Sequence, residues 1–132
     1  MPIQRRGEDH YDWALYGGRG ELGVDWYFRQ TTALAASVML YHLEPGAEEG
    51  THHHLEGDDS SCSVKSSDEL YVVVAGEVVM NLDGERTVLH PGDSAYAPAG
   101  LPHGVANESD APAELILVFG PPLGNDTPQP KA

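Results

Sequence analysis

Short runs of apolar and β-branched residues alternate with turn signals along most of this chain, and no long stretch has helical periodicity. Pro45-Gly46 and Pro91-Gly92 mark turns, and Asp83-Gly84 is typical of a two-residue β-hairpin loop. The turns separate predicted strands at residues 24–29, 36–43, 69–75, 77–82, 85–89, 94–97, 103–107 and 114–119. This spacing predicts an all-β fold, a jelly-roll β-barrel or β-sandwich.

The 132 residues suit a single domain, which we divide into three segments. Residues 1–23 are expected to be a loosely structured lead-in, 24–119 the barrel, and 120–132 an extended arm rich in Pro and Gly. We see no signal peptide and no membrane-spanning apolar run, so we expect a cytoplasmic protein without a membrane partner. The single cysteine, Cys62, excludes an internal disulfide.

The chain has a formal net charge of -14 and only seven lysines and arginines. Such a surface repels phosphate backbones, so no nucleic-acid partner is expected. An acidic excess of this kind is typical of a surface that keeps a protein soluble. The expected partner is therefore a small-molecule substrate.

Histidine is concentrated in one place, at the consecutive residues His52, His53 and His54. Alternate residues of a strand share a face, so His52 and His54 are expected to point one way and His53 the other. Glu69 opens an otherwise apolar strand, where a buried carboxylate needs a partner, and His103 opens another strand. Three imidazoles and one carboxylate suit one divalent ion, such as zinc, iron, manganese or nickel.

Two spaced motifs connect these side chains with particular glycines, a proline and an asparagine. The first reads Gly46-x5-His52-x-His54, then Glu69-x6-Gly76. The second reads Gly92-x5-Pro98-x-Gly100-x2-His103-x3-Asn107. They are similar to the two motifs of the cupin superfamily, so the chain resembles a small single-domain conserved-barrel cupin. The resemblance implies a metal inside the barrel with positions open to water or substrate. Its implied ligands, and through the metal its catalytic residues, are His52, His54, Glu69 and His103.

One feature departs from the family pattern, because the fourteen residues 55–68 separate His54 from Glu69 where the family usually has a much shorter spacer. This polar insertion is expected to form a surface loop beside the metal, as part of a lid or rim. The fourth ligand position is therefore open to alternatives. His53 or His42 could replace Glu69 as a ligand, and Glu69 could act as a free base. We retain Glu69 because the spacing that follows it matches the motif.

Strand residues expected to face the metal are mostly apolar or aromatic, and none of them is Lys or Arg. The candidate pocket consists of Met39, Tyr41, Tyr71, Val73, Met80, Tyr96, Val105 and Phe119. Without a fixed cation, this pocket suits a small, largely apolar or aromatic substrate better than a dicarboxylate or a phosphosugar.

Three functions fit such a pocket. The preferred one is a cyclase that uses the metal, with a slight preference for zinc, as a Lewis acid. It is preferred because residues 4–9 and 119–123 resemble the chain ends of small cupins from aromatic polyketide pathways, including polyketide cyclases of antibiotic biosynthesis. The alternatives are an iron-type dioxygenase of the quercetinase-like class and a non-enzymatic ligand-binding cupin. The family resemblance also implies a homodimer.

Overall fold

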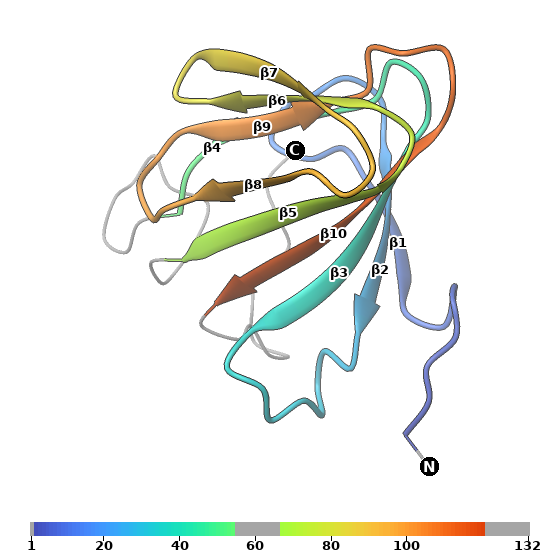
Figure 1. The fold of residues 1–132 in the computed structure, drawn as a ribbon. Helices are drawn as coiled ribbons and strands as arrows, with labels where there is room; N and C mark the ends of the chain where they lie inside the picture. The colour runs from blue at the N-terminus through green and yellow to red at the C-terminus, as the bar shows by residue number, and fades with distance from the viewer. Residues whose placement is uncertain (1, 55–66, 121–132) are drawn as a thin grey trace.

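The computed structural model describes residues 2–54 and 67–120, and this part of the chain forms β-strands without a helix (Figure 1). The strands are β1 (His10–Trp13), β2 (Leu22–Tyr27), β3 (Ser37–Leu43), β4 (Glu48–His52), β5 (Asp68–Ala75), β6 (Val78–Leu82), β7 (Glu85–Leu89), β8 (Ser94–Ala97), β9 (His103–Ala106) and β10 (Ala113–Gly120). Among the described residues, no helix is available to cross a membrane. Cys62, most of the predicted 55–68 insertion and the predicted arm beyond Gly120 lie outside the described residues.

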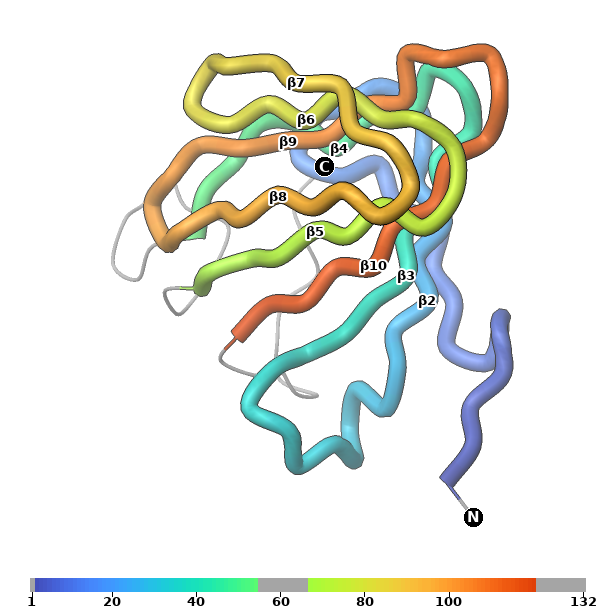
Figure 2. Tube along the Cα trace, viewed as in Figure 1, coloured from blue at the N-terminus to red at the C-terminus, as the bar shows by residue number. Residues whose placement is uncertain are grey.

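The strands form two antiparallel sheets that face each other around a common interior (Figure 1). One sheet has the order β1-β2-β3-β10-β5-β8, and the other has the order β4-β9-β6-β7. Segments far apart in the sequence therefore lie side by side, as Figure 2 shows for β10 between β3 and β5. This arrangement confirms the predicted all-β jelly-roll fold.

The hairpin between β6 and β7 follows directly from its sequence. Asp83 and Gly84 have φ angles of 51° and 86°, the left-handed pair that a type I′ turn requires. Gly adopts this conformation without steric strain, and Asp tolerates it better than most residues. Leu82 then pairs with Glu85, so the two-residue loop fixes the register of both strands.

The six-stranded sheet begins earlier in the chain than residue 24, where the barrel segment was predicted to start. Strand β1 and the first residues of β2 belong to the predicted lead-in, and Trp13 pairs with Leu22. Leu15 and Leu22 are fully buried. The glycines between these two leucines form turns that connect packed parts of the fold. In the sequence alone, such a glycine-rich stretch looks like a loosely structured segment.

Alternate residues along the strands fill the space between the sheets, so each sheet contributes an apolar face to one core. The end of the barrel where Leu43 pairs with Ala113 is closed by apolar side chains. Fully buried residues toward this end include Leu22, Leu43, Val78, Ala113 and Leu115. Glu69, at the start of β5, pairs with Phe119 at the other end of the sheet. Polar groups in the interior gather toward that second end.

Two residues of the cupin motifs have structural roles. Gly76 has a φ of 74°, and a Cβ there would lie 2.5 Å from the carbonyl oxygen of Pro112, so only glycine allows this close approach. Asn107 is buried, and its amide donates to the carbonyl oxygens of Leu43 and Ala111 at 2.9 and 2.8 Å. These motif positions hold loops together at a distance from the histidine cluster.

Candidate metal centre

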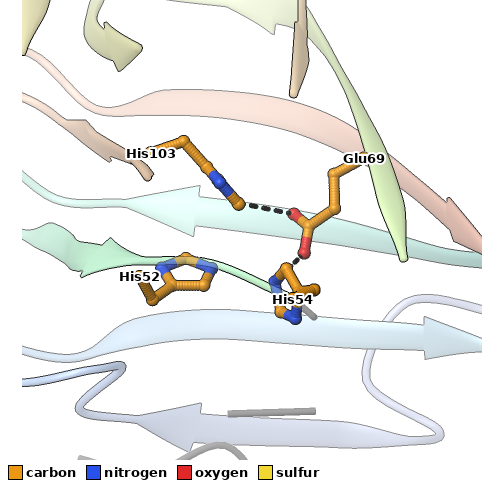
Figure 3. Close-up of side chains that lie close together, drawn as sticks. All are labelled: His52, His54, Glu69 and His103. Carbon is orange, nitrogen blue, oxygen red and sulfur yellow. Dashed lines mark ion pairs between the residues drawn. The ribbon is translucent and has the colours of Figure 1, made fainter. Parts of the chain in front are cut away.

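Four side chains that are distant in sequence converge inside the barrel (Figure 3). His52 ends β4 and pairs directly with His103, which begins β9 of the same sheet. His54 follows two residues after β4, and Glu69 projects from β5 of the opposing sheet. The site therefore spans the two sheets and is complete only when they pack together.

The cluster is compact, because one ligand atom from each side chain lies within 4.8 Å of the others. The ring centroids of His52 and His103 are 4.3 Å apart, and those of His52 and His54 are 4.8 Å apart. Nε2 of His103 lies 3.5 Å from Oε2 of Glu69, and His54 pairs with the other carboxylate oxygen (Figure 3). No member of the cluster is more than 8% exposed.

Two of the imidazoles are oriented by the backbone. Nδ1 of His52 donates to the carbonyl oxygen of Gly50 at 2.7 Å, and Nδ1 of His103 donates to that of Leu101 at 2.8 Å. Each Nε2 is then a lone-pair donor buried in the cluster, where neither forms a hydrogen bond to the described residues. Buried nitrogen lone pairs beside a carboxylate fit a divalent cation.

The electrostatics of His52 and Glu69 favour the forms that bind a cation, whereas at His103 burial is outweighed by the Glu69 carboxylate, which raises the pKa of that imidazole. Burial lowers the pKa of His52 to about 3, so its imidazole is neutral at neutral pH. Burial would raise the pKa of Glu69, but the neighbouring imidazoles of His103 and His54 outweigh it and hold that pKa below its ordinary value. Glu69 is therefore ionised. Neutral imidazole and ionised carboxylate are the forms that coordinate metals.

The two histidines considered as alternative ligands lie apart from the cluster. His53 is half-buried and is not among the convergent residues. The ring nitrogens of His42 pair with Glu114 at 3.1 Å and Glu44 at 3.0 Å, and its side chain is partly exposed. The structure thus brings Glu69, rather than His53 or His42, to the three imidazoles.

The residues predicted to line the pocket are buried in the interior with one exception. The buried ones are Met39, Tyr41, Tyr71, Val73, Met80, Val105 and Phe119. Tyr96 is 54% exposed, so its predicted place in the pocket is wrong. Ala95 and Ala97 take the inward positions of β8, and the alternation of the strand turns Tyr96 outward, where its hydroxyl donates to Asp68.

Glu49 is a buried residue of the interior that sequence reasoning missed. The hydroxyls of Tyr41 and Tyr71 donate to its two carboxylate oxygens, each at 2.7 Å. Glu49 and His52 are three residues apart, so simple alternation would place them on opposite faces. The register of β4 shifts between them, however, and both are buried. The sequence contains no signal for this bulge.

Tyr16 is a second residue near the cluster that the sequence did not indicate. Its ring stacks on His52 with the centroids 3.6 Å apart and the planes at 17°. It also meets the ring of His54 edge-on at 6.3 Å. Tyr16 lies in the glycine-punctuated lead-in, where no periodic pattern pointed to a packed side chain.

Fold and site together define a class of protein: a two-sheet β-barrel that gathers three imidazoles and a carboxylate at one end of its interior. The chain belongs to the cupin family, because the Cupin domain model (Cupin_2) matches residues 39–119, more than half of its length. The resemblance drawn from the two motifs is therefore confirmed. An uncharacterized relative from Methanocaldococcus jannaschii is 30% identical over 61 residues, 46% of this chain and 49% of that protein. The chain thus spans about half the length of this relative.

Two solved structures share the architecture. Protein TT1209 from Thermus thermophilus is 30% identical with a TM-score of 0.61, and the match covers 92% of this chain and 98% of that one. A protein from Thermotoga maritima described as a predicted oxalate decarboxylase is 20% identical with a TM-score of 0.73, covering 91% and 98%. At 20% identity, the second likeness supports the fold alone.

Proposed function

We propose that this cupin is a metal-dependent enzyme that acts on a small, uncharged, largely aromatic carbonyl compound, as a catalyst of the polyketide cyclase type. The observation that carries the proposal is the buried convergence of His52, His54, Glu69 and His103. A divalent ion bound there would supply a Lewis acid that polarises a carbonyl group of the substrate. Among the candidate metals, three imidazoles and one carboxylate suit zinc well.

The charges of the interior support an uncharged substrate. Buried polar residues in the described part of the chain include Glu49, Glu69 and the cluster histidines, and none is Lys or Arg. Phosphate and carboxylate groups are usually bound through such cations. Apart from the proposed ion, an anionic substrate would find no buried cationic side chain here among the described residues, whereas a neutral ring with carbonyl groups needs none.

The apolar residues beside the cluster would orient the substrate by shape. Phe119 pairs with Glu69 across the sheet, and Tyr71 shares the buried face of Glu69 on β5. Side chains of this kind hold a flat ring by van der Waals contact and exclude water. A dry site strengthens the stabilisation of charge that develops on a substrate oxygen.

The proposal is tested with zinc-loaded protein and aromatic β-diketones, assayed with and without dioxygen. NMR measures solvent deuterium at the carbon between the carbonyls and any cyclised product. We expect enolisation or cyclisation at equal rates in both atmospheres, about 100-fold faster than with His103→Ala as the ligand-deficient control.

Two other outcomes would overturn the proposal. Turnover that requires dioxygen and appears only with iron would identify a dioxygenase. Saturable binding of the diketones without exchange or conversion, measured by calorimetry, would identify a ligand-binding cupin.

A further inference from the structure

Residues 15–19, which we call the clamp, run along β4, the edge strand of the smaller sheet. The carbonyl oxygen of Leu15 accepts from the amide of Gly50 at 2.9 Å. The carbonyl oxygen of Arg19 accepts from the amide of Glu48 at 2.8 Å. Nε of Arg19 also donates to Oε1 of Glu48 at 3.2 Å. The clamp is therefore bonded to β4 at both of its ends.

Two glycines bring the clamp and β4 into direct backbone contact. A Cβ on Gly50 would lie 1.9 Å from the carbonyl oxygen of Tyr16, and a Cβ on Gly18 would lie 2.1 Å from that of Glu48. Real side chains do not tolerate such distances, so both positions require glycine at this spacing. The close contact fixes the distance between the backbone of the clamp and the backbone of β4.

Tyr16 has an unusual backbone conformation within the clamp. Its φ is 54°, a left-handed value that a bulky non-glycine residue rarely adopts. Strain of this kind persists only where the surroundings enforce it, and it is common at functional sites. Here the conformation places the ring flat on the imidazole of His52, 3.6 Å between centroids.

The clamp is also connected to His52 through hydrogen bonds of Gly50. The amide of Gly50 donates to the clamp at Leu15, and its carbonyl oxygen accepts from Nδ1 of His52 at 2.7 Å. The ring of His52 is thus held on one face by Tyr16 and at one edge by a carbonyl that the clamp itself fixes. Both contacts restrict rotation of the imidazole.

We propose that Tyr16 is a positioning residue of the metal centre, which fixes the orientation of His52 so that Nε2 faces the ion. The inference rests on the proposed metal site and adds to it a contact from outside both cupin motifs. The stacked ring also covers one side of the imidazole against water. Tyr16 acts through His52, so its loss should change the geometry and affinity of metal binding before it changes the fold.

The test uses Co²⁺, whose visible absorption reports the geometry of its ligands, added to the full-length protein. Tyr16→Leu removes the aromatic face, Tyr16→Phe keeps it, and Gly18→Ala pushes the clamp off β4 without touching His52. Tyr11→Leu is the matched control, because Tyr11 belongs to the same N-terminal region but stacks on Trp13. Circular dichroism of each variant without metal checks folding.

We expect Tyr16→Leu and Gly18→Ala to weaken Co²⁺ binding about tenfold to 100-fold and to shift the spectrum. Tyr16→Phe and Tyr11→Leu should match the wild type. A folded Tyr16→Leu protein with wild-type affinity and spectrum would overturn the inference, as would Tyr16→Phe behaving like Tyr16→Leu. If Tyr16→Leu does not fold, the Co²⁺ spectra of Gly18→Ala and Tyr16→Phe, compared with the results expected above, decide whether the inference holds. A wild-type protein that binds no Co²⁺ would instead refute the metal site itself.

Discussion

At the scale of single residues, Glu49 is an acidic group in an apolar interior. It is 3% exposed, and among the residues that the structure describes, two tyrosine hydroxyls donate to its carboxylate. Burial and the nearby Glu69 carboxylate raise the pKa of Glu49 from 4.5 to about 7, although the tyrosines and His103 oppose the shift. The folded protein therefore prefers this carboxyl group protonated.

This preference predicts a pH-dependent effect of Glu49→Gln. With a raised folded-state pKa, the contribution of Glu49 to stability is fully present below pH 4.5 and is lost as the pH rises through about 7. Relative to the wild type, the variant should gain about 3 kcal/mol of unfolding free energy between pH 4.5 and pH 8. Urea unfolding in chelator at several pH values measures this. Glu85→Gln, at an exposed position of β7, is the control, and a pH-independent difference would contradict the prediction.

Glu69 poses a different question, whether its carboxylate binds the metal or acts as a free base. Its contacts with His54 and His103 favour a ligand, so Glu69→Gln should weaken metal binding by about tenfold or more. Chelator competition measures the affinity, with Glu77→Gln as an exposed control. Unchanged affinity combined with lost turnover would show that Glu69 is a base.

Part of the site could be predicted because strand alternation and the two motifs can both be read directly from the sequence. Alternation along the strands placed Glu69 and Tyr71 on one buried face, and the two motifs brought His52 and His103 into one prediction. Glu49 was missed because a bulge, set by pairing between β4 and β9, changes which residues of β4 are buried. Tertiary pairing of this kind leaves no local pattern.

At the scale of elements, the outer side of the larger sheet carries an ionic network between β3 and β10. His42 pairs with Glu44 and Glu114, and Arg6 donates to Glu114 at 2.8 Å. The hydrogen bond to Glu44 raises the pKa of His42, with Glu114 adding to the effect and burial opposing it. These contacts fasten the chain before β1 and the end of β3 onto β10.

This network predicts the pH profile of His42→Gln. A raised folded-state pKa means that the stabilisation by His42 is fully present below 6.5 and is lost as the pH rises through the folded value. The variant should be destabilised by at most about 1 kcal/mol at pH 5.5 and hardly at all at pH 8.5, because the groups are partly exposed. Thermal unfolding measures the loss of stability at each pH. Adding 0.5 M salt should reduce it, because the Debye length is then only about 4 Å and the charges are screened. A larger loss at pH 8.5 would contradict the assignment.

The strands themselves were largely predictable, since their turns are marked by residues with special backbone preferences. The Asp83-Gly84 loop is the clearest case, with both residues left-handed as a type I′ turn requires. Strand β1 and the start of β2 were not predicted, because the intervening glycines resemble a loose segment. This segment is ordered by the burial of Leu15 and Leu22, which is a consequence of tertiary packing.

At the scale of the whole molecule, the two sheets have separate roles. Tight apolar packing closes one end of the barrel, and the pairing of β4 with β9 against β5 gathers the three histidines and Glu69 toward the other. The ligands from opposite sheets meet only in the folded protein. Metal binding should therefore stabilise the native state, because the unfolded chain offers no comparable site.

The most direct test of the central claim is the metal content of the purified protein, measured by elemental analysis beside His103→Ala. The structure predicts about one divalent ion per chain in the wild type and far less in the variant, which lacks one imidazole of the cluster. A wild-type protein that holds no zinc, iron, manganese or nickel, even after incubation with each, would contradict the assignment of His52, His54, Glu69 and His103 as a metal centre.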